Sequence, residues 1–161
     1  MRIDMHPNEF IVSKTDLKGR ITYGNETFIK MSGYQERELL NAPHNLLRHP
    51  DMPAVVFRLL WQRIQGKQGI HAFVKNRTKD AKYYWVFANV TPSCDEAGNV
   101  VGYYSVRRRP SDKALSIIEP LYRELAQIER RYGINEAHAH LEKHLAAQGL
   151  DYDEFVIRLQ K

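Results

Sequence analysis

The chain of 161 residues contains a single cysteine, Cys94. One thiol excludes an intramolecular disulfide and is typical of a reducing compartment. No apolar run approaches the ~20 residues that cross a bilayer, and the first residues lack the apolar core of a signal peptide. We therefore expect a cytoplasmic protein that makes no membrane contact.

The motifs of common enzyme classes are also missing. The sequence contains no nucleophile elbow, no glycine-rich phosphate loop and no paired catalytic carboxylates, so we expect a protein that is not an enzyme. The net charge of +5 is modest, and no helix-turn-helix or zinc-finger spacing accompanies the basic run Arg107–Arg109 with Lys75, Arg77 and Lys82. This run is more simply a charged strand end at a pocket rim, and we expect no nucleic-acid partner.

Hydrophobic residues make up 43% of the chain and aromatic residues 11%. This content supports one hydrophobic core rather than two full domains. The pattern divides into a first domain over residues 1–110 and a C-terminal helical extension over residues 111–161.

The first domain alternates short β-prone runs with turn-forming residues. Asn25 is suited to cap a short helix that stops at Gly33, a second helix follows over 35–40, and an amphipathic helix is predicted from Pro53 to Gly66. Five strands are predicted, at 9–14, 20–23, 70–76, 83–91 and 100–107. This order predicts an α+β fold with one five-stranded antiparallel sheet and small helices on one face.

The extension reads as three helices. The first covers residues 111–132, with a restart at Pro120, and carries an apolar stripe that either packs on its own domain or forms a dimer or signalling helix. The stripe consists of Leu121, Leu125, Ile128 and Tyr132. Two more helices are expected, over 135–148 and, with Asp151 as a cap, over 151–159.

The segment Arg48-His49-Pro50-Asp51-Met52-Pro53 combines three polar side chains with two prolines. Proline restricts its own φ and the residue before it, so the segment is nearly rigid. The free amides of the helix that follows add partial positive charge beside Arg48. The segment is either a clamp for an anionic ligand or an ordinary capped turn.

Several strings appear together, in order, over roughly residues 10 to 125. They are Asn25-Glu26-Thr27-Phe28, Ser32-Gly33-Tyr34, Pro43-His44-Asn45, the Arg48–Pro53 segment, Val74-Lys75-Asn76-Arg77, Tyr84-Trp85-Val86 with Asn89, and Glu119-Pro120-Leu121-Tyr122. In these strings the chain resembles PAS domains, specifically the FAD-binding PAS domains of bacterial aerotaxis receptors. The Ser-Gly-Tyr string is common among PAS domains, whereas the Arg48–Pro53 string is much narrower.

The resemblance implies that a pocket between the sheet and the small helices holds FAD non-covalently. FAD needs apolar walls, amide partners for its pyrimidine edge and cations for its pyrophosphate. Trp61 and Trp85 are candidate pocket walls, with core packing as the alternative. Carried over by motif, the expected cofactor-binding residues are Asn25, Arg48, His49, Asp51, Asn76 and Asn89.

Other cofactors remain open at this point. Haem is the main rival, with His44, His49 and His71 as candidate axial ligands. A light-sensing flavin domain needs a cysteine in the short helix that leads into the pocket, and none is present. His138, His140 and His144 have a spacing that can hold zinc, but a solvated helix face is the simpler interpretation and we expect no metal.

We therefore predict a redox- or oxygen-responsive signalling sensor that transmits the state of FAD to its C-terminal helices or to a signalling partner. The alternatives are a haem-binding gas sensor and a ligand-free interaction module. A homodimer is possible. We do not expect the membrane anchor or the direct control of chemotaxis that a resemblance to aerotaxis receptors would otherwise imply.

Overall fold

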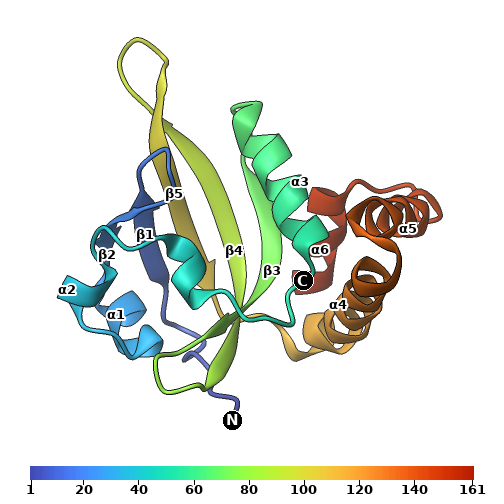
Figure 1. Cartoon of the computed structure of the whole chain (residues 1–161), viewed down its shortest axis with the longest axis horizontal. Helices are drawn as coiled ribbons and strands as arrows, with labels where there is room; N and C mark the ends of the chain where they lie inside the picture. The colour runs from blue at the N-terminus through green and yellow to red at the C-terminus, as the bar shows by residue number, and fades with distance from the viewer.

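The computed structural model describes residues 1–161 and is built on one five-stranded antiparallel sheet (Figure 1). The strand order across the sheet is β2-β1-β5-β4-β3, so the first strand, β1, pairs with the last strand, β5, and β2 forms one edge. The strands are β1 (Ile11–Thr15), β2 (Ile21–Gly24), β3 (Ile70–Arg77), β4 (Tyr83–Cys94) and β5 (Val100–Arg108). The predicted α+β class and the five strands are confirmed.

The segment between β2 and β3 lies on one face of the sheet (Figure 1). Asn25 begins α1 as predicted, because its side-chain oxygen accepts a hydrogen bond from the N–H of Phe28. A short 3₁₀ helix then leads through the proline-rich segment into the long helix of this half. These elements are α1 (Glu26–Ser32), α2 (Glu36–Leu39), η1 (His44–Leu47) and α3 (Ala54–Gln65).

The extension forms three helices that lie beside β3 and α3 in Figure 1: α4 (Asp112–Tyr132), α5 (Ile134–Ala146) and α6 (Tyr152–Gln160). The predicted restart at Pro120 is wrong, because α4 continues through this residue. Proline inside a helix removes one hydrogen bond and costs about 3 kcal/mol. Burial of Leu115, Ile118 and Leu121 on both sides of Pro120 offsets that cost.

Alternation along β4 sends side chains into two separate cores. Tyr84, Val86 and Ala88 pack with the small helices α1 and α2, in a cluster that also holds Phe28. Trp85 and Phe87 point to the opposite face and belong to a second cluster with residues of α4, α5 and α6. Over β3 and β4 the extension of the same chain covers this face.

The extension is therefore part of the same packed body as the sheet. Leu121 and Leu125 of the apolar stripe are buried and Ile128 is partly buried, whereas Tyr132 is 65% exposed. The stripe packs on its own domain over most of its length. None of the helices combines the length and hydropathy of a bilayer-spanning segment.

Candidate ligand-binding cavity

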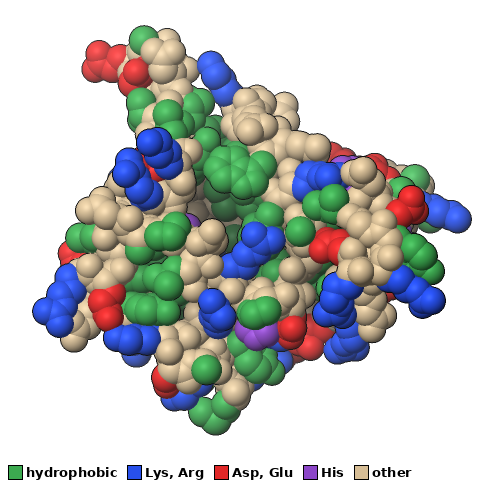
Figure 2. Space-filling model, viewed as in Figure 1, with side chains coloured by type: hydrophobic (Ala, Val, Ile, Leu, Met, Phe, Trp, Pro, Cys, Tyr) green, Lys and Arg blue, Asp and Glu red, His purple; other side chains and the backbone are tan.

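A cavity of about 280 Å³ lies between the inner face of the sheet, η1 and α3. Figure 2 shows hydrophobic side chains gathered in the hollow between α3 and the β4–β5 hairpin. Trp61 of α3 and Tyr103 of β5 meet edge to face there, with ring centroids 5.6 Å apart. The other apolar walls come from α3 and from the strands: Phe57, Leu60, Ile64, Val74, Ala88 and Val90.

One end of this cavity is polar and deeply buried. The guanidinium of Arg107, which is 3% exposed, donates a hydrogen bond to the hydroxyl of Ser13. Its Nη1 lies 3.2 Å from Nε2 of His44. The His44 ring stacks on the ring of Phe28, with the two centroids 6.0 Å apart. The guanidinium carbon of Arg107 also lies over the Phe28 ring, 5.0 Å from its centroid. No carboxylate is paired with this arginine, so its charge faces the cavity without compensation.

The protonation states at this end follow from burial. Burial, aided by the charge of Arg107, lowers the pKa of His44 to about 3, so the imidazole is neutral at pH 7 and accepts from Arg107. Burial also lowers the pKa of Arg107, to about 10, which leaves the guanidinium protonated. The polar end therefore carries one net positive charge at neutral pH.

Three buried polar atoms near this charge have no hydrogen-bond partner within the chain. They are Nδ2 of Asn76, the hydroxyl of Tyr84 and Nε of Arg107. Buried donors without partners cost about 1–3 kcal/mol each, so folded proteins rarely retain them without a reason. Asn76 and Arg107 also line the cavity. A guest with hydrogen-bond acceptors along one edge would satisfy these donors.

The mouth of the cavity carries a second cation. The guanidinium of Arg48 lies 3.8 Å from the ring centroid of Phe57, in the first turn of α3. Arg48 also pairs through its backbone with Asn76 on the edge strand β3, which fixes the proline-rich segment against the sheet. Burial lowers the pKa of Arg48, and the carboxylate of Glu129 opposes this shift.

The structure brings together three of the eight predicted cofactor-binding residues. Arg48, Trp61 and Asn76 line the cavity. The other five lie elsewhere: Asn25, His49, Asp51, Trp85 and Asn89. Strand alternation explains two of the five, because Trp85 and Asn89 share the outer face of β4. On that face the ring centroids of Trp85 and Tyr122 lie 5.9 Å apart.

The remaining three already have partners within the fold. The Oδ1 of Asn25 accepts from the N–H groups of Val12 and Phe28, and its Nδ2 donates to the carbonyl of Phe10. The carboxylate of Asp51 accepts from Nζ of Lys75 at 3.0 Å. His49 lies against Tyr83 and near Asp51, outside the cavity. The contacts of Asn25 tie β1 to the start of α1, and those of His49 and Asp51 tie the Arg48–Pro53 segment to β3 and β4.

Sequence reasoning missed the residues that β1 and β5 contribute to the cavity. Ser13 on β1, and Tyr103, Ser105 and Arg107 on β5, all point inward. Their alternate spacing on β5 was visible in the sequence. Which of three consecutive arginines is buried was not, because that depends on the register of β5 against β1, where Arg107 faces Ile11.

The other side chains considered as candidates for a binding or metal site do not come together in the structure. Arg108 lies over Phe87 on the outer face, and Arg109 approaches Asp4. Cys94 is exposed at the end of β4. His138 faces Glu142 and His140 faces Glu124, so these imidazoles point to different carboxylates.

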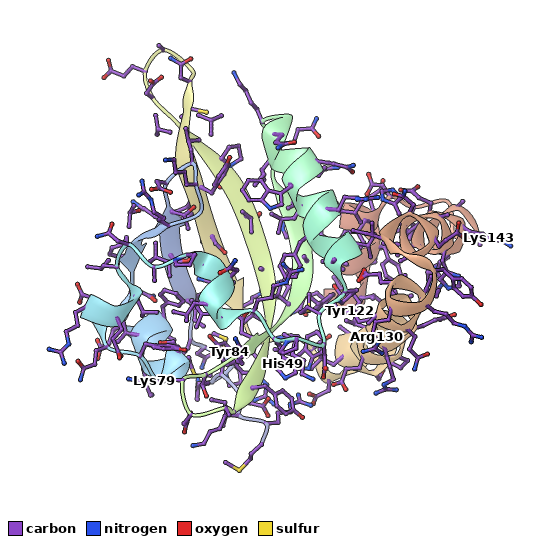
Figure 3. The ribbon with its side chains drawn as sticks, in the orientation of Figure 1. His49, Lys79, Tyr84, Tyr122, Arg130 and Lys143 are labelled. Carbon is purple, nitrogen blue, oxygen red and sulfur yellow. The ribbon has the colours of Figure 1, made fainter.

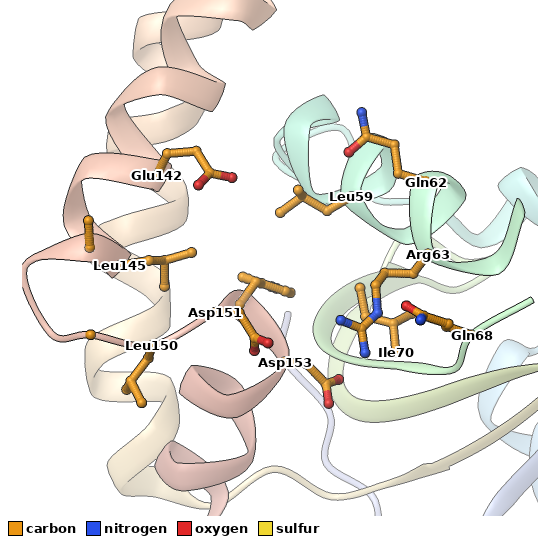
Figure 4. A pocket seen from close by; sticks show the side chains of 13 residues that line it. Leu59, Gln62, Arg63, Gln68, Ile70, Glu142, Leu145, Leu150, Asp151 and Asp153 are labelled. Carbon is orange, nitrogen blue, oxygen red and sulfur yellow. The ribbon is translucent and has the colours of Figure 1, made fainter. Parts of the chain in front are cut away.

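A second cleft of about 490 Å³ separates α3 from α5 and α6 (Figure 4). Several of its charged side chains already have partners within the chain. Nε of Arg63 donates to the carbonyl of Gly69, Asp151 caps α6, and Asp153 accepts from the backbone N–H of His71. The cavity beside Arg107 retains unsatisfied donors and is the better candidate site.

Comparison with known proteins agrees with this fold. A family model described as the PAS fold matches residues 21–107. The chain belongs to the PAS family. It is 43% identical to the aerotaxis receptor of Escherichia coli K12 over 115 residues, which are 71% of this chain and 22% of the receptor. It is 29% identical to the nitrogen fixation regulatory protein of Klebsiella pneumoniae over 60% of this chain and 20% of that protein.

Among solved structures, a light-oxygen-voltage domain studied with a flavin analogue superposes with a TM-score of 0.60. The two chains are 20% identical, and the match covers 69% of this chain and 83% of that domain. This PAS chain spans about a fifth of the length of the two curated relatives. The PAS fold inferred from the sequence motifs is thus confirmed.

Proposed function

We propose that this PAS domain binds FAD non-covalently in the cavity beside Arg107 and serves as a redox- or oxygen-responsive sensor. The observation that carries the proposal is the buried, uncompensated Arg107 together with the unpartnered donor of Asn76. Both face a cavity with aromatic and aliphatic walls. The similarity to an aerotaxis receptor agrees with the resemblance that the sequence motifs show, and that resemblance implies FAD.

The residues present fit a flavin. The pyrimidine edge of its ring system carries carbonyl and ring-nitrogen acceptors, which suit donors from Asn76 and Arg107. Trp61 and Tyr103 provide aromatic walls, and Arg48 at the mouth suits a pyrophosphate by its planar fork of donors. A bound flavin supplies reversible electron transfer. Asn76 and Arg107 are then the donors whose hydrogen bonds change in strength with the redox state.

A sensor rather than an enzyme is proposed. The relatives above are named as a receptor and a regulatory protein. We propose that the output passes through residues 111–161 to a signalling partner or to a second copy of the chain, in the cytoplasm.

The first test is the absorption spectrum of freshly purified protein, with chromatography of any cofactor released on denaturation. Flavin bands near ~450 nm and released FAD are expected. Arg107→Met should lose the flavin, whereas Arg108→Met, the neighbouring exposed arginine, should retain it. Thermal melts by circular dichroism establish that both variants fold. Flavin content equal to wild type in folded Arg107→Met would remove the site assignment.

Haem is the second candidate, because His44 is the one of its three predicted ligands that lines the cavity. His49 lies outside it, and His71 lies on the outer face with Asp153. Nε2 of His44 is engaged by Arg107, which would have to move before a metal could bind there. A Soret band would favour haem. A colourless protein that also fails to take up added FAD would favour an interaction module.

A further inference from the structure

A carboxylate from the extension caps helix α3. The backbone N–H groups of Ala54 and Val55 donate to the two carboxylate oxygens of Glu129, each at 2.8 Å. The preceding residue, Pro53, has no side-chain group that could cap the helix, and the N–H of Val56 already bonds to the Pro53 carbonyl. Glu129 therefore satisfies the two amides that the first turn leaves free.

The same turn of α3 borders the ligand cavity. Phe57, in that turn, lines the cavity and carries the guanidinium of Arg48 on its ring. The segment that joins Arg48 to α3 is short and contains Pro50 and Pro53, so it transmits a displacement rather than absorbing it. The first turn of α3 thus contacts the cavity on one side and Glu129 on the other.

Further contacts tie the extension to α3 and to the sheet. Arg58 of α3 donates to the side chain of Asn135 at the start of α5. The hydroxyl of Tyr122 donates to the carbonyl of Phe73 on β3 and lies 2.6 Å from the hydroxyl of Tyr152 on α6. Figure 3 marks Tyr122 and Arg130 on α4, on the side of the extension that meets α3.

We propose that Glu129 couples occupancy of the cavity to the C-terminal helices. An anionic group that engages Arg48 draws this cation away from the ring of Phe57, shifts the first turn of α3 and weakens the carboxylate contact, which loosens the end of α4. Glu129 is a positioning residue, since it acts through α3. The inference rests on the proposed function only in requiring a ligand in the cavity. Coupling is reciprocal, so weakening the contact should strengthen ligand binding by the same factor.

Hydrogen exchange with and without FAD tests the coupling in the full chain. In wild type, FAD should accelerate exchange at Ala54 and Val55 and over residues 126–132. In Glu129→Gln, which keeps one acceptor but loses the charge, this ligand-dependent difference should disappear and FAD should bind about fivefold more tightly. The exposed α5 variant Glu136→Gln is the matched control and should behave as wild type.

A ligand-free comparison keeps the coupling separate from flavin binding. Arg48→Met should accelerate exchange at Ala54 and Val55 several-fold in protein without cofactor, because it removes the cation that packs on Phe57 in the first turn of α3. Unchanged exchange in Arg48→Met would overturn the coupling, as would an identical FAD response in wild type and Glu129→Gln. A wild type that binds no FAD contradicts the proposed function, and the Arg48→Met comparison then decides the coupling alone.

Discussion

Arg107 is the residue whose placement most needs a functional explanation. A buried charge without a carboxylate partner destabilises a fold, because desolvation costs several kcal/mol and nothing inside the chain offsets it in full. Ser13 and His44 provide only neutral contacts. A bound ligand with acceptor atoms would supply the missing partner, and for that reason we place the ligand edge at Arg107.

Asn76 and Asn89 were both predicted from the sequence as cofactor-binding residues, but their substitution by alanine should affect FAD affinity differently. Asn76→Ala removes an unpartnered donor that faces the cavity, so FAD affinity should fall about tenfold while the melting temperature stays near that of wild type. Asn89→Ala, on the outer face of the same sheet, should leave affinity unchanged. Titration of flavin fluorescence measures both. Equal losses in the two variants would contradict the assignment.

His44 should make the fold sensitive to acid. Its pKa is about 3 in the folded protein and 6.5 in the unfolded chain. Above about pH 6.5 the ring is neutral in both states and contributes nothing to pH dependence. As pH falls toward 3, the unfolded chain binds a proton that the folded protein excludes, so stability falls by on the order of 1 kcal/mol per pH unit.

The variant His44→Gln retains an acceptor for Arg107 but does not titrate. Urea unfolding at pH 7 and at pH 4 should show a smaller loss of stability in His44→Gln than in wild type. The same loss in both proteins would mean that His44 is not buried as a neutral ring.

From the sequence, the type of a residue predicted what its side chain can bind better than it predicted where in the fold that side chain lies. The Asn25 cap was predictable from its type and its position before an apolar run. It was not predictable that Asn76 faces the cavity while Asn89 lies on the outer face of the sheet. A strand that the same chain buries on both faces gives no hydrophobic alternation from which its orientation could be read.

At the scale of elements, the buried hydroxyl pair of Tyr122 and Tyr152 joins α4 and α6 to β3. Tyr122→Phe removes the donor to the Phe73 carbonyl and should lower the free energy of unfolding by about 1–2 kcal/mol. Tyr132→Phe, on the exposed end of α4, should change it by less than about 0.5 kcal/mol. Chemical denaturation of both variants checks this; equal effects would place the Tyr122 hydroxyl in solvent.

Gly102 marks a close approach between β5 and β1. A Cβ at this position would lie 2.2 Å from the carbonyl oxygen of Thr15, which is far inside van der Waals contact. Gly102→Ala should destabilise the protein by about 2 kcal/mol or more, because one strand must shift. The adjacent Val101→Ala, at a 52% exposed side chain, should cost less than about 1 kcal/mol. A neutral Gly102→Ala in thermal denaturation would contradict this packing.

Most elements were predictable because their signals are local. Turn residues and apolar periodicity give five strands, the small helices and α3. The continuity of α4 through Pro120 was not predictable, since it depends on tertiary burial of Leu115, Ile118 and Leu121. The cap that Glu129 supplies to α3 was equally hidden, because its partners lie 75 and 74 residues away.

At the scale of the whole molecule, the predicted boundary at residue 110 separates elements but divides the larger of the two cores. Trp85, Phe73 and Phe87 pack with residues of α4 to α6. A chain ending at residue 110 would expose this face, so it should aggregate or bind a hydrophobic dye strongly. Size-exclusion chromatography of residues 1–110 tests this. A monomeric fragment with a cooperative thermal transition would show that the extension is dispensable for folding.

The most direct test of the flavin site is a crystal structure of the protein loaded with FAD. We expect the flavin ring system in the cavity between α3 and the sheet, with acceptor atoms within hydrogen-bonding distance of Asn76 and Arg107 and the pyrophosphate near Arg48. A flavin bound elsewhere, or one whose acceptor atoms turn away from Arg107, would contradict the proposed site.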